Sequence, residues 1–262
     1  MVNQHGHWIW YELLTSDADA AQGFYGKVVG WTAAPAEISG APNPMDYRIL
    51  TATDGENAGG LMTLPDGAPM SPAWRGYIGV DDVDAAVAAV ESEGGRVLMP
   101  AMDVPGVGRM ALLADPQGIT FYVMKGAVDQ ASTAYGRRAM GHCSWNELIV
   151  PDDAAALGLY ERVFGIVKVG ALSMGDMGEY SFLKHPGADE AYGALMRQQP
   201  DQPAAGWRFY FRVPDIEIAA ETVRSEGGRI VMGPMEVPGG EWVLSAIDPQ
   251  GAAFGLVAPA RG

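Results

Sequence analysis

The chain contains two copies of one sequence pattern. Gly6–Leu13, with the spacing Gly-His-x-x-Trp-x-Glu-Leu, returns as Gly141–Leu148, and Asp115–Gly118 (Asp-Pro-Gln-Gly) returns as Asp248–Gly251. Matched residues between these segments include Tyr47 and Tyr180, Trp74 and Trp207, and Tyr77 and Tyr210. A duplication this long predicts two equivalent domains, and each copy tests what is inferred from the other.

The duplication divides the 262 residues into a first domain at 1–126, a linker at 127–140 and a second domain at 141–262. Domains of this size can bury a core of their own. Hydrophobic residues make up 48% and charged residues 19% of the chain, which is typical of a globular protein rather than a disordered one.

The formal net charge of -15 limits the partners. It opposes binding to a phosphate backbone and to anionic membranes, and no apolar run is long enough to span a bilayer. The single cysteine, Cys143, excludes an internal disulfide, and the N-terminal residues show no export signal. We therefore expect a cytoplasmic protein whose partner is a small molecule. It would be a monomer with pseudo-dimeric domain packing or a homodimer.

Each half is predicted to form two modules, each with one strand, one helix and three strands. In the first module, strand 8–14 precedes a helix that starts at Ser16–Asp19 and stops before Gly30. In the second, Asp82 caps a helix that ends at Gly94. The other strands of the first half are expected at 31–36, 47–53, 60–64, 75–80, 96–99, 109–114 and 119–124. The second half repeats this order, with strands at 143–150 and 207–213 and helices at about 152–164 and 215–226.

Three local motifs accompany this order of elements. They are Asp17-x6-Phe24-Tyr25-x4-Gly30-Trp31, Val80-Asp-Asp-Val-Asp-Ala-Ala and Asp115-Pro-Gln-Gly118. Together they resemble the vicinal oxygen chelate superfamily, which includes glyoxalase I, bleomycin-resistance proteins and extradiol dioxygenases. The resemblance implies an α+β tandem fold in which four βαβββ modules form two cupped mixed sheets. It does not fix the function, because this fold hosts many chemistries.

In metal-using members of that superfamily, the first, fifth and eighth strands supply the metal ligands. The corresponding positions of this chain hold Trp10, Arg75 and Tyr122 in the first half, and Trp145, Arg208 and Gly255 in the second. Trp, Arg and Gly offer no side-chain lone pair to a metal, and neutral Tyr is a poor ligand. We therefore predict no metal site and no other cofactor.

The residues around the missing ligands form a repeated set. Residues i and i+2 of a strand share a face, which groups Trp10 with Glu12, Trp145 with Glu147, Arg75 with Tyr77, and Arg208 with Tyr210 and Arg212. Because a buried carboxylate needs a partner, Glu12–Arg75 and Glu147–Arg208 are the expected pairs. Two interpretations stay open: a structural ion pair in a relic metal site, or a polar anchor in a ligand pocket.

Three functions fit this set. In a metal-independent enzyme, Glu12 or Glu147 is the base for a small carbonyl or hydroxylated metabolite. Its electrophile is Arg75 or Arg208, and its proton donor is Tyr77, Tyr122 or Tyr210. Such an enzyme would be a glyoxalase-like lyase or isomerase, or an oxidoreductase. In the alternative, the pocket sequesters a small molecule, as bleomycin-resistance proteins do, and its lining is Trp10, Trp145, Tyr77, Tyr210 and Arg212. In the third, the pocket is degenerate and the role is structural or signalling.

The remaining reactive residues are predicted to have structural roles. His7 and His142 fall on the strand face opposite the Trp–Glu set and are expected to pack, whereas His5 with His7 could form an adventitious metal site. His185 has no counterpart in the first half and is expected at the surface. Cys143 is expected to be a small buried hydrophobe.

Overall fold

The computed structural model describes residues 3–36, 46–64, 67, 70–200 and 204–260. Within those ranges, the first half forms β1 (Trp8–Thr15), α1 (Ala18–Val28), β2 (Thr32–Pro35), β3 (Tyr47–Thr51), β4 (Asn57–Thr63), β5 (Ala73–Gly79), α2 (Val83–Ser92), β6 (Arg96–Val104), β7 (Gly108–Ala114) and β8 (Thr120–Gly126). The second half forms β9 (Cys143–Val150), α3 (Asp153–Phe164), β10 (Val167–Ser173), a short 3-10 helix η1 (Gly175–Met177), β11 (Glu179–Lys184), β12 (Gly193–Arg197), β13 (Gly206–Arg212), α4 (Ile216–Ser225), β14 (Arg229–Glu236), β15 (Trp242–Ile247) and β16 (Ala253–Ala258).

The strands form two mixed sheets of eight strands each, which confirms the predicted α+β class. Their orders are β2-β3-β4-β1-β5-β8-β7-β6 and β10-β11-β12-β9-β13-β16-β15-β14. In each module the first and last strands pair in parallel, and the others pair antiparallel. A parallel pair of this kind requires a crossover connection, and the helix with the two intervening strands provides it.

Aspartates begin all four α-helices, as the sequence indicates. The carboxylate of Asp17 accepts a hydrogen bond from Ala20 N, and that of Asp82 accepts one from Ala85 N. Asp152 and Asp215 do the same for α3 and α4. Each contact satisfies a backbone donor that has no partner within the first turn, which stabilises the helix by about 1 kcal/mol.

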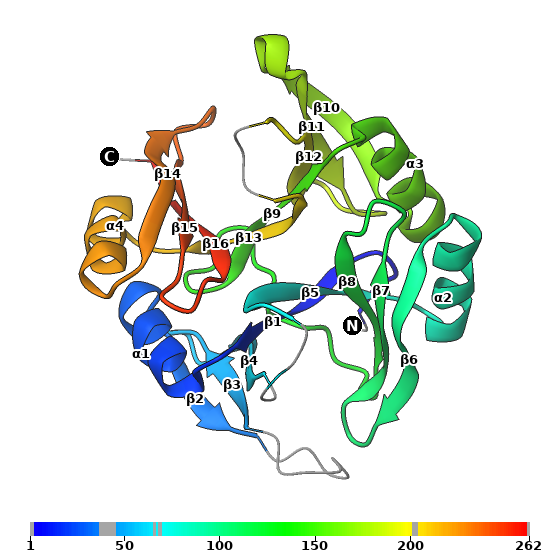
Figure 1. The fold of residues 1–262 in the computed structure, drawn as a ribbon, viewed down its shortest axis with the longest axis horizontal. Coiled ribbons are helices and arrows are strands. Elements are labelled where there is room, and N and C mark those ends of the chain that lie inside the picture. Colours follow the sequence, from blue (N-terminus) through cyan, green and yellow to red (C-terminus); the bar gives the residue numbers. More distant parts are fainter. Residues whose placement is uncertain (1–2, 37–45, 65–66, 68–69, 201–203, 261–262) are drawn as a thin grey trace. The chain divides into compact units, whose positions relative to one another are not determined.

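The chain divides into two compact units, and each unit combines one module of the first half with one module of the second. Unit 1 comprises the described residues of 1–9, 76–132 and 146–207, and unit 2 comprises those of 10–75, 133–145 and 208–262. In unit 2, α1 lies beside α4; in unit 1, α2 lies beside α3 (Figure 1). Ala134, which lies within the residues predicted as a linker, is fully buried in unit 2.

The core of unit 2 is an aromatic cluster around Tyr25 of α1. The Tyr25 hydroxyl donates to Asp248 (3.0 Å) and accepts from Trp74 Nε1 (2.9 Å). The Tyr25 ring lies 5.3 Å from that of Phe254 in an edge arrangement, and Trp31 lies 4.8 Å from Phe211. Because Tyr25 comes from the first half and Asp248 from the second, the repeated Asp-Pro-Gln-Gly turn packs under the helix of the other copy.

Unit 1 repeats this arrangement with the halves exchanged. Trp207 Nε1 donates to the Tyr160 hydroxyl of α3 at 3.1 Å, and Phe121 packs 5.8 Å from Tyr160. Gln117 of the first Asp-Pro-Gln-Gly turn bonds to the backbone of Asp152. Each unit thus has an aromatic core to which both halves contribute.

Among the described residues, no helix is both long and apolar enough to cross a membrane.

Candidate functional site

The predicted Trp–Glu set of the first half lies on β1, in unit 2. Glu12 is 5% exposed and lies opposite Gly60 of β4. Trp10 Nε1 donates to the Tyr47 hydroxyl at 3.0 Å. A Cβ atom at Gly60 would lie 2.1 Å from the Tyr47 hydroxyl oxygen, so this glycine makes room for the tyrosine. The repeated Tyr47 was visible in the sequence but was not predicted as a site residue.

At the matching position of the second half, a tyrosine contacts the buried carboxylate. In unit 1, Tyr180 of β11 donates its hydroxyl hydrogen to Glu147 Oε2 of β9 at 2.9 Å. Glu147 is 7% exposed. A buried carboxylate that accepts a hydrogen bond from a tyrosyl hydroxyl is held in one orientation, which is what a general base needs.

The two arginines at the fifth-strand positions are half-buried. Arg75 Nη1 donates to the carbonyl oxygen of Trp74 at 3.3 Å, and Arg208 lies at the equivalent place on β13. Their predicted pairing with Glu12 and Glu147 stays a prediction.

Aromatic rings fill the eighth-strand position in both halves. In unit 1, Tyr77 and Tyr122 lie opposite each other on β5 and β8 and stack, with ring centroids 4.2 Å apart and 6° between the planes. In unit 2, Tyr210 lies over Gly255, where a Cβ atom would be 2.3 Å from the Tyr210 ring. The Tyr210 hydroxyl is 3.1 Å from Ser245 Oγ. Tyr77, Tyr122 and Tyr210 are all buried, so the structure supports packing roles for them.

Arg212, predicted as a ligand-binding residue, is buried and belongs to a partly buried ionic cluster in unit 2. Its Nη1 atom donates to Glu241 Oε1 at 2.6 Å and lies 3.4 Å from Ser144 Oγ. Arg137 binds the other oxygen of the same carboxylate, with Nη2 at 2.7 Å from Oε2. The Arg137 guanidinium also lies over the Trp145 ring, 5.1 Å from its centroid. We call Arg137, Ser144, Arg212 and Glu241 the arginine–glutamate cluster.

The electrostatics of this cluster follow from its hydrogen bonds. Burial by itself raises the pKa of Glu241, but the hydrogen bonds from Arg137 and Arg212 outweigh it and hold that pKa below its ordinary value. Glu241 therefore stays ionised at neutral pH. Sequence reasoning missed Arg137, Ser144 and Glu241, because none recurs in the other half at the matching place.

The histidines and the cysteine are structural, with one correction. The buried His142 lies with Nε2 3.1 Å from Asp54, and the thiol of Cys143 is buried, which raises its pKa to about 12, so both predicted packing roles are supported. His185, in contrast, is not at the surface: it is 3% exposed. Its ring stacks on His7 (4.3 Å) and on Tyr192 (3.7 Å). The prediction was wrong because a contact between residues so far apart in the sequence leaves no local signal.

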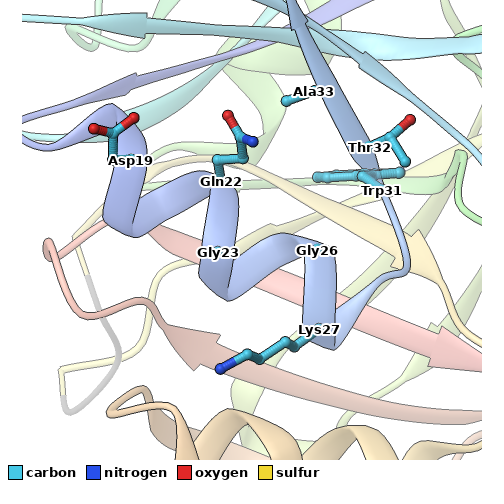
Figure 2. Close-up of a pocket in the computed structure, with 8 residues that line it drawn as sticks. All are labelled: Asp19, Gln22, Gly23, Gly26, Lys27, Trp31, Thr32 and Ala33. Carbon is cyan, nitrogen blue, oxygen red and sulfur yellow. The ribbon is translucent and has the colours of Figure 1, made fainter.

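An open pocket of about 680 Å³ lies elsewhere in unit 2, between α1 and β2 (Figure 2). Gly23 and Gly26 line it from α1, where they leave the helix backbone uncovered. Lys27 lies in the last turn of α1, and Trp31 directly precedes β2 (Figure 2). Its lining includes none of the predicted site residues.

The comparisons with known proteins agree with the fold and with the duplication. The model of the Glyoxalase/Bleomycin resistance protein/Dioxygenase superfamily matches residues 8–123 and again residues 139–256. The chain belongs to this superfamily.

Individual relatives extend over nearly the whole chain. CFP32 of Mycobacterium tuberculosis, named as a candidate glyoxylase, is 32% identical over 253 residues, which is 96% of this chain and 94% of that protein. The anthracycline biosynthesis protein DauV of a Streptomyces species is 28% identical over 95% of this chain and 91% of its own length. The Mn(II)-bound glyoxalase from Novosphingobium aromaticivorans superimposes with a TM-score of 0.65 over 99% of this chain and 84% of its own, at 17% identity, which shows a shared fold.

The residues of this chain do not fit a divalent metal of the kind that the superfamily implies. Among the described residues, no group of three or more His, Cys, Asp or Glu side chains could hold a metal ion. The positions matched to metal ligands are instead occupied by an indole in a hydrogen bond (Trp10) and by packed aromatic rings (Tyr122, and Tyr210 over Gly255). A function without a metal stays a prediction.

Proposed function

We propose that this chain is an enzyme of the superfamily that performs acid–base chemistry on a small carbonyl or hydroxylated metabolite through a carboxylate rather than a metal. The observation that supports this best is the Glu147–Tyr180 hydrogen bond of 2.9 Å to a carboxylate that is 7% exposed. Glu12, which is 5% exposed, is the equivalent base in the first half.

The proposed chemistry is proton transfer at a carbon next to a carbonyl group. Glu147 takes the proton while the Tyr180 hydroxyl keeps the carboxylate oriented, and the same carboxyl group returns the proton to the product. When Glu12 is the base, the proposed electrophiles for the negative charge that develops on the carbonyl oxygen are Arg75 and Arg208, which belong to the same unit 2. The 32% sequence identity to CFP32, which is named as a candidate glyoxylase, supports a reaction of the glyoxalase type.

Deuterium uptake tests this proposal directly. Hydroxyacetone in D2O should exchange its carbon-bound hydrogens faster with the protein than without it, and a chelator should leave that rate unchanged. The double variant Glu12→Gln/Glu147→Gln should lower the enzyme-dependent rate by about 100-fold or more, because it removes both bases, and Glu147→Gln alone reports on the second half. Glu12→Gln reports on the first half, and Glu236→Gln, at an exposed position on β14, is the control. Exchange that survives at the wild-type rate in the Glu12→Gln/Glu147→Gln double variant would exclude this role.

A second candidate function is the binding of a flat aromatic molecule without conversion. The similarity to DauV, an anthracycline biosynthesis protein, favours it. Quenching of anthracycline fluorescence at a fixed stoichiometry, with the compound recovered unchanged, would support this function. A protein that converts hydroxyacetone and does not quench the fluorescence would refute it.

A further inference from the structure

The arginine–glutamate cluster is an addition of the second half and not a requirement of the fold. The first half has Ile9 in place of Ser144, Gly79 in place of Arg212 and Gly108 in place of Glu241. The first sheet still forms all eight strands with these substitutes. Burying a guanidinium is costly, and Arg212 has only 6% of its side chain exposed. The second half therefore keeps a buried guanidinium that costs free energy to desolvate and that the same architecture does not need.

The turn before β15 is rebuilt to admit the glutamate. In the first half, a Cβ atom at Gly108 would lie 2.2 Å from the carbonyl oxygen of Lys125, so no side chain fits there. In the second half the glycine lies one residue earlier, at Gly240, and this frees the next position for Glu241. Gly239 and Gly240 have φ values of 104° and 85°, a region open mainly to glycine. Two successive glycines restrict the backbone of this hairpin less than residues with side chains would.

The geometry of the two arginines is that of a carboxylate receptor. Arg212 and Arg137 donate to opposite oxygens of one carboxylate, at 2.6 and 2.7 Å. Paired guanidinium donors of this kind recognise carboxylates with high specificity. Trp145 fixes the Arg137 guanidinium by lying beneath it. In this structure the chain's own Glu241 provides the carboxylate.

We propose that Arg137 and Arg212 form a binding site for the carboxylate of a small organic acid, and that Glu241 closes the site until such a ligand displaces it. This inference rests on the proposed small-molecule function, and it specifies that the ligand bound by the second half is a carboxylate. Its test, however, measures binding alone and needs no turnover.

Benzoate and its neutral analogue benzamide are the probes, and calorimetry on the full chain is the measurement. Glu241→Ala opens the receptor, so it should bind benzoate at least about tenfold more tightly than the wild type does, and benzamide should not gain affinity. Adding Arg212→Met to Glu241→Ala should abolish the gain. Glu236→Ala removes an exposed carboxylate from β14 of the same hairpin and should bind as the wild type does.

Several results would overturn the proposal. They are equal benzoate affinity in the wild type and in Glu241→Ala, an equal gain for benzamide, or a gain that survives Arg212→Met. Glu241→Gln keeps the shape and removes the charge, so it replaces the alanine variant if that one does not fold. If neither variant folds even in 0.1 M acetate, Glu241 is a structural residue and the receptor role is wrong. A failed deuterium exchange with a positive benzoate result would refute only the proposed catalysis.

Discussion

At the scale of the residue, His185 shows how burial and a second titrating ring act together. Its ring lies between those of His7 and Tyr192. Burial, followed by repulsion from His7, lowers the pKa of His185 to about 3. In the unfolded chain, His185 takes up a proton near pH 6.5, whereas in the folded chain it does so only near pH 3. The free energy of unfolding is therefore highest above pH 6.5 and falls as the pH is lowered toward 3. Protonation of His185 in the unfolded chain should lower the free energy of unfolding by roughly 3 kcal/mol between pH 6.5 and pH 4.

Replacing His185 by Phe keeps a ring in the stack and removes the proton. The free energy of unfolding of this variant, measured in urea at pH 4 to 7, should depend less on pH than that of the wild type by roughly the same 3 kcal/mol. Tyr192→Phe keeps the stacked ring and both imidazoles, so it should leave the pH profile as it is in the wild type. Parallel profiles for the wild type and His185→Phe would contradict the assignment.

Sequence patterns predict such residues only where the information is local or repeated. His142 was predicted to pack because of its odd spacing from Trp145, and Cys143 because a cysteine at a strand start is usually a small buried hydrophobe. Glu12 and Glu147 were found through the repeat, and the structure confirms that both are buried. His185 and Glu241 could not be found in this way, because each acts through a partner that only the folded chain brings near.

At the scale of the element, the helices follow from their caps, and the main departures are in strand length. The spacing predicted a strand at 96–99, whereas β6 extends from Arg96 to Val104 and includes Pro100. Pro100 fits into β6 because this strand lies at the edge of its sheet, where a missing backbone donor is tolerated.

Two glycines, one in α1 and one in β4, should respond to alanine in opposite directions. A Cβ atom at Gly23 of α1 would meet nothing within 4 Å, so Gly23→Ala should raise the free energy of unfolding by about 0.5–1 kcal/mol through helix propensity. At Gly60 the added carbon would strike the Tyr47 hydroxyl, and Gly60→Ala should lower that free energy by about 1–3 kcal/mol. Urea unfolding measures both, and Tyr47→Phe separates the lost hydrogen bond from the clash. An unchanged free energy of unfolding in Gly60→Ala would mean that the Tyr47 hydroxyl is not held against Gly60.

At the scale of the whole molecule, the sequence repeat and the compact units divide the chain differently. The repeat separates the halves near residues 127–140, and the superfamily matches follow it. Each compact unit, however, joins a module of the first half to one of the second. A repeat reports ancestry and fold, whereas the division into units depends on which helices pack together, here α1 with α4 and α2 with α3.

This arrangement predicts that neither half is stable as a monomer. A chain of residues 1–132 would leave Tyr25 without Asp248 and Phe24 without the ring of Phe254, so buried aromatic surface and a buried hydroxyl would face water. We expect residues 1–132 alone to lack a cooperative thermal transition in circular dichroism. Co-expressed with residues 133–262, it should form a 1:1 complex on gel filtration that regains the transition. The point mutation Tyr25→Phe should weaken that complex, because it removes a hydrogen bond made across the two pieces. A folded, monomeric first half would instead show that each repeat carries a complete core and that the packing of α1 with α4 is dispensable.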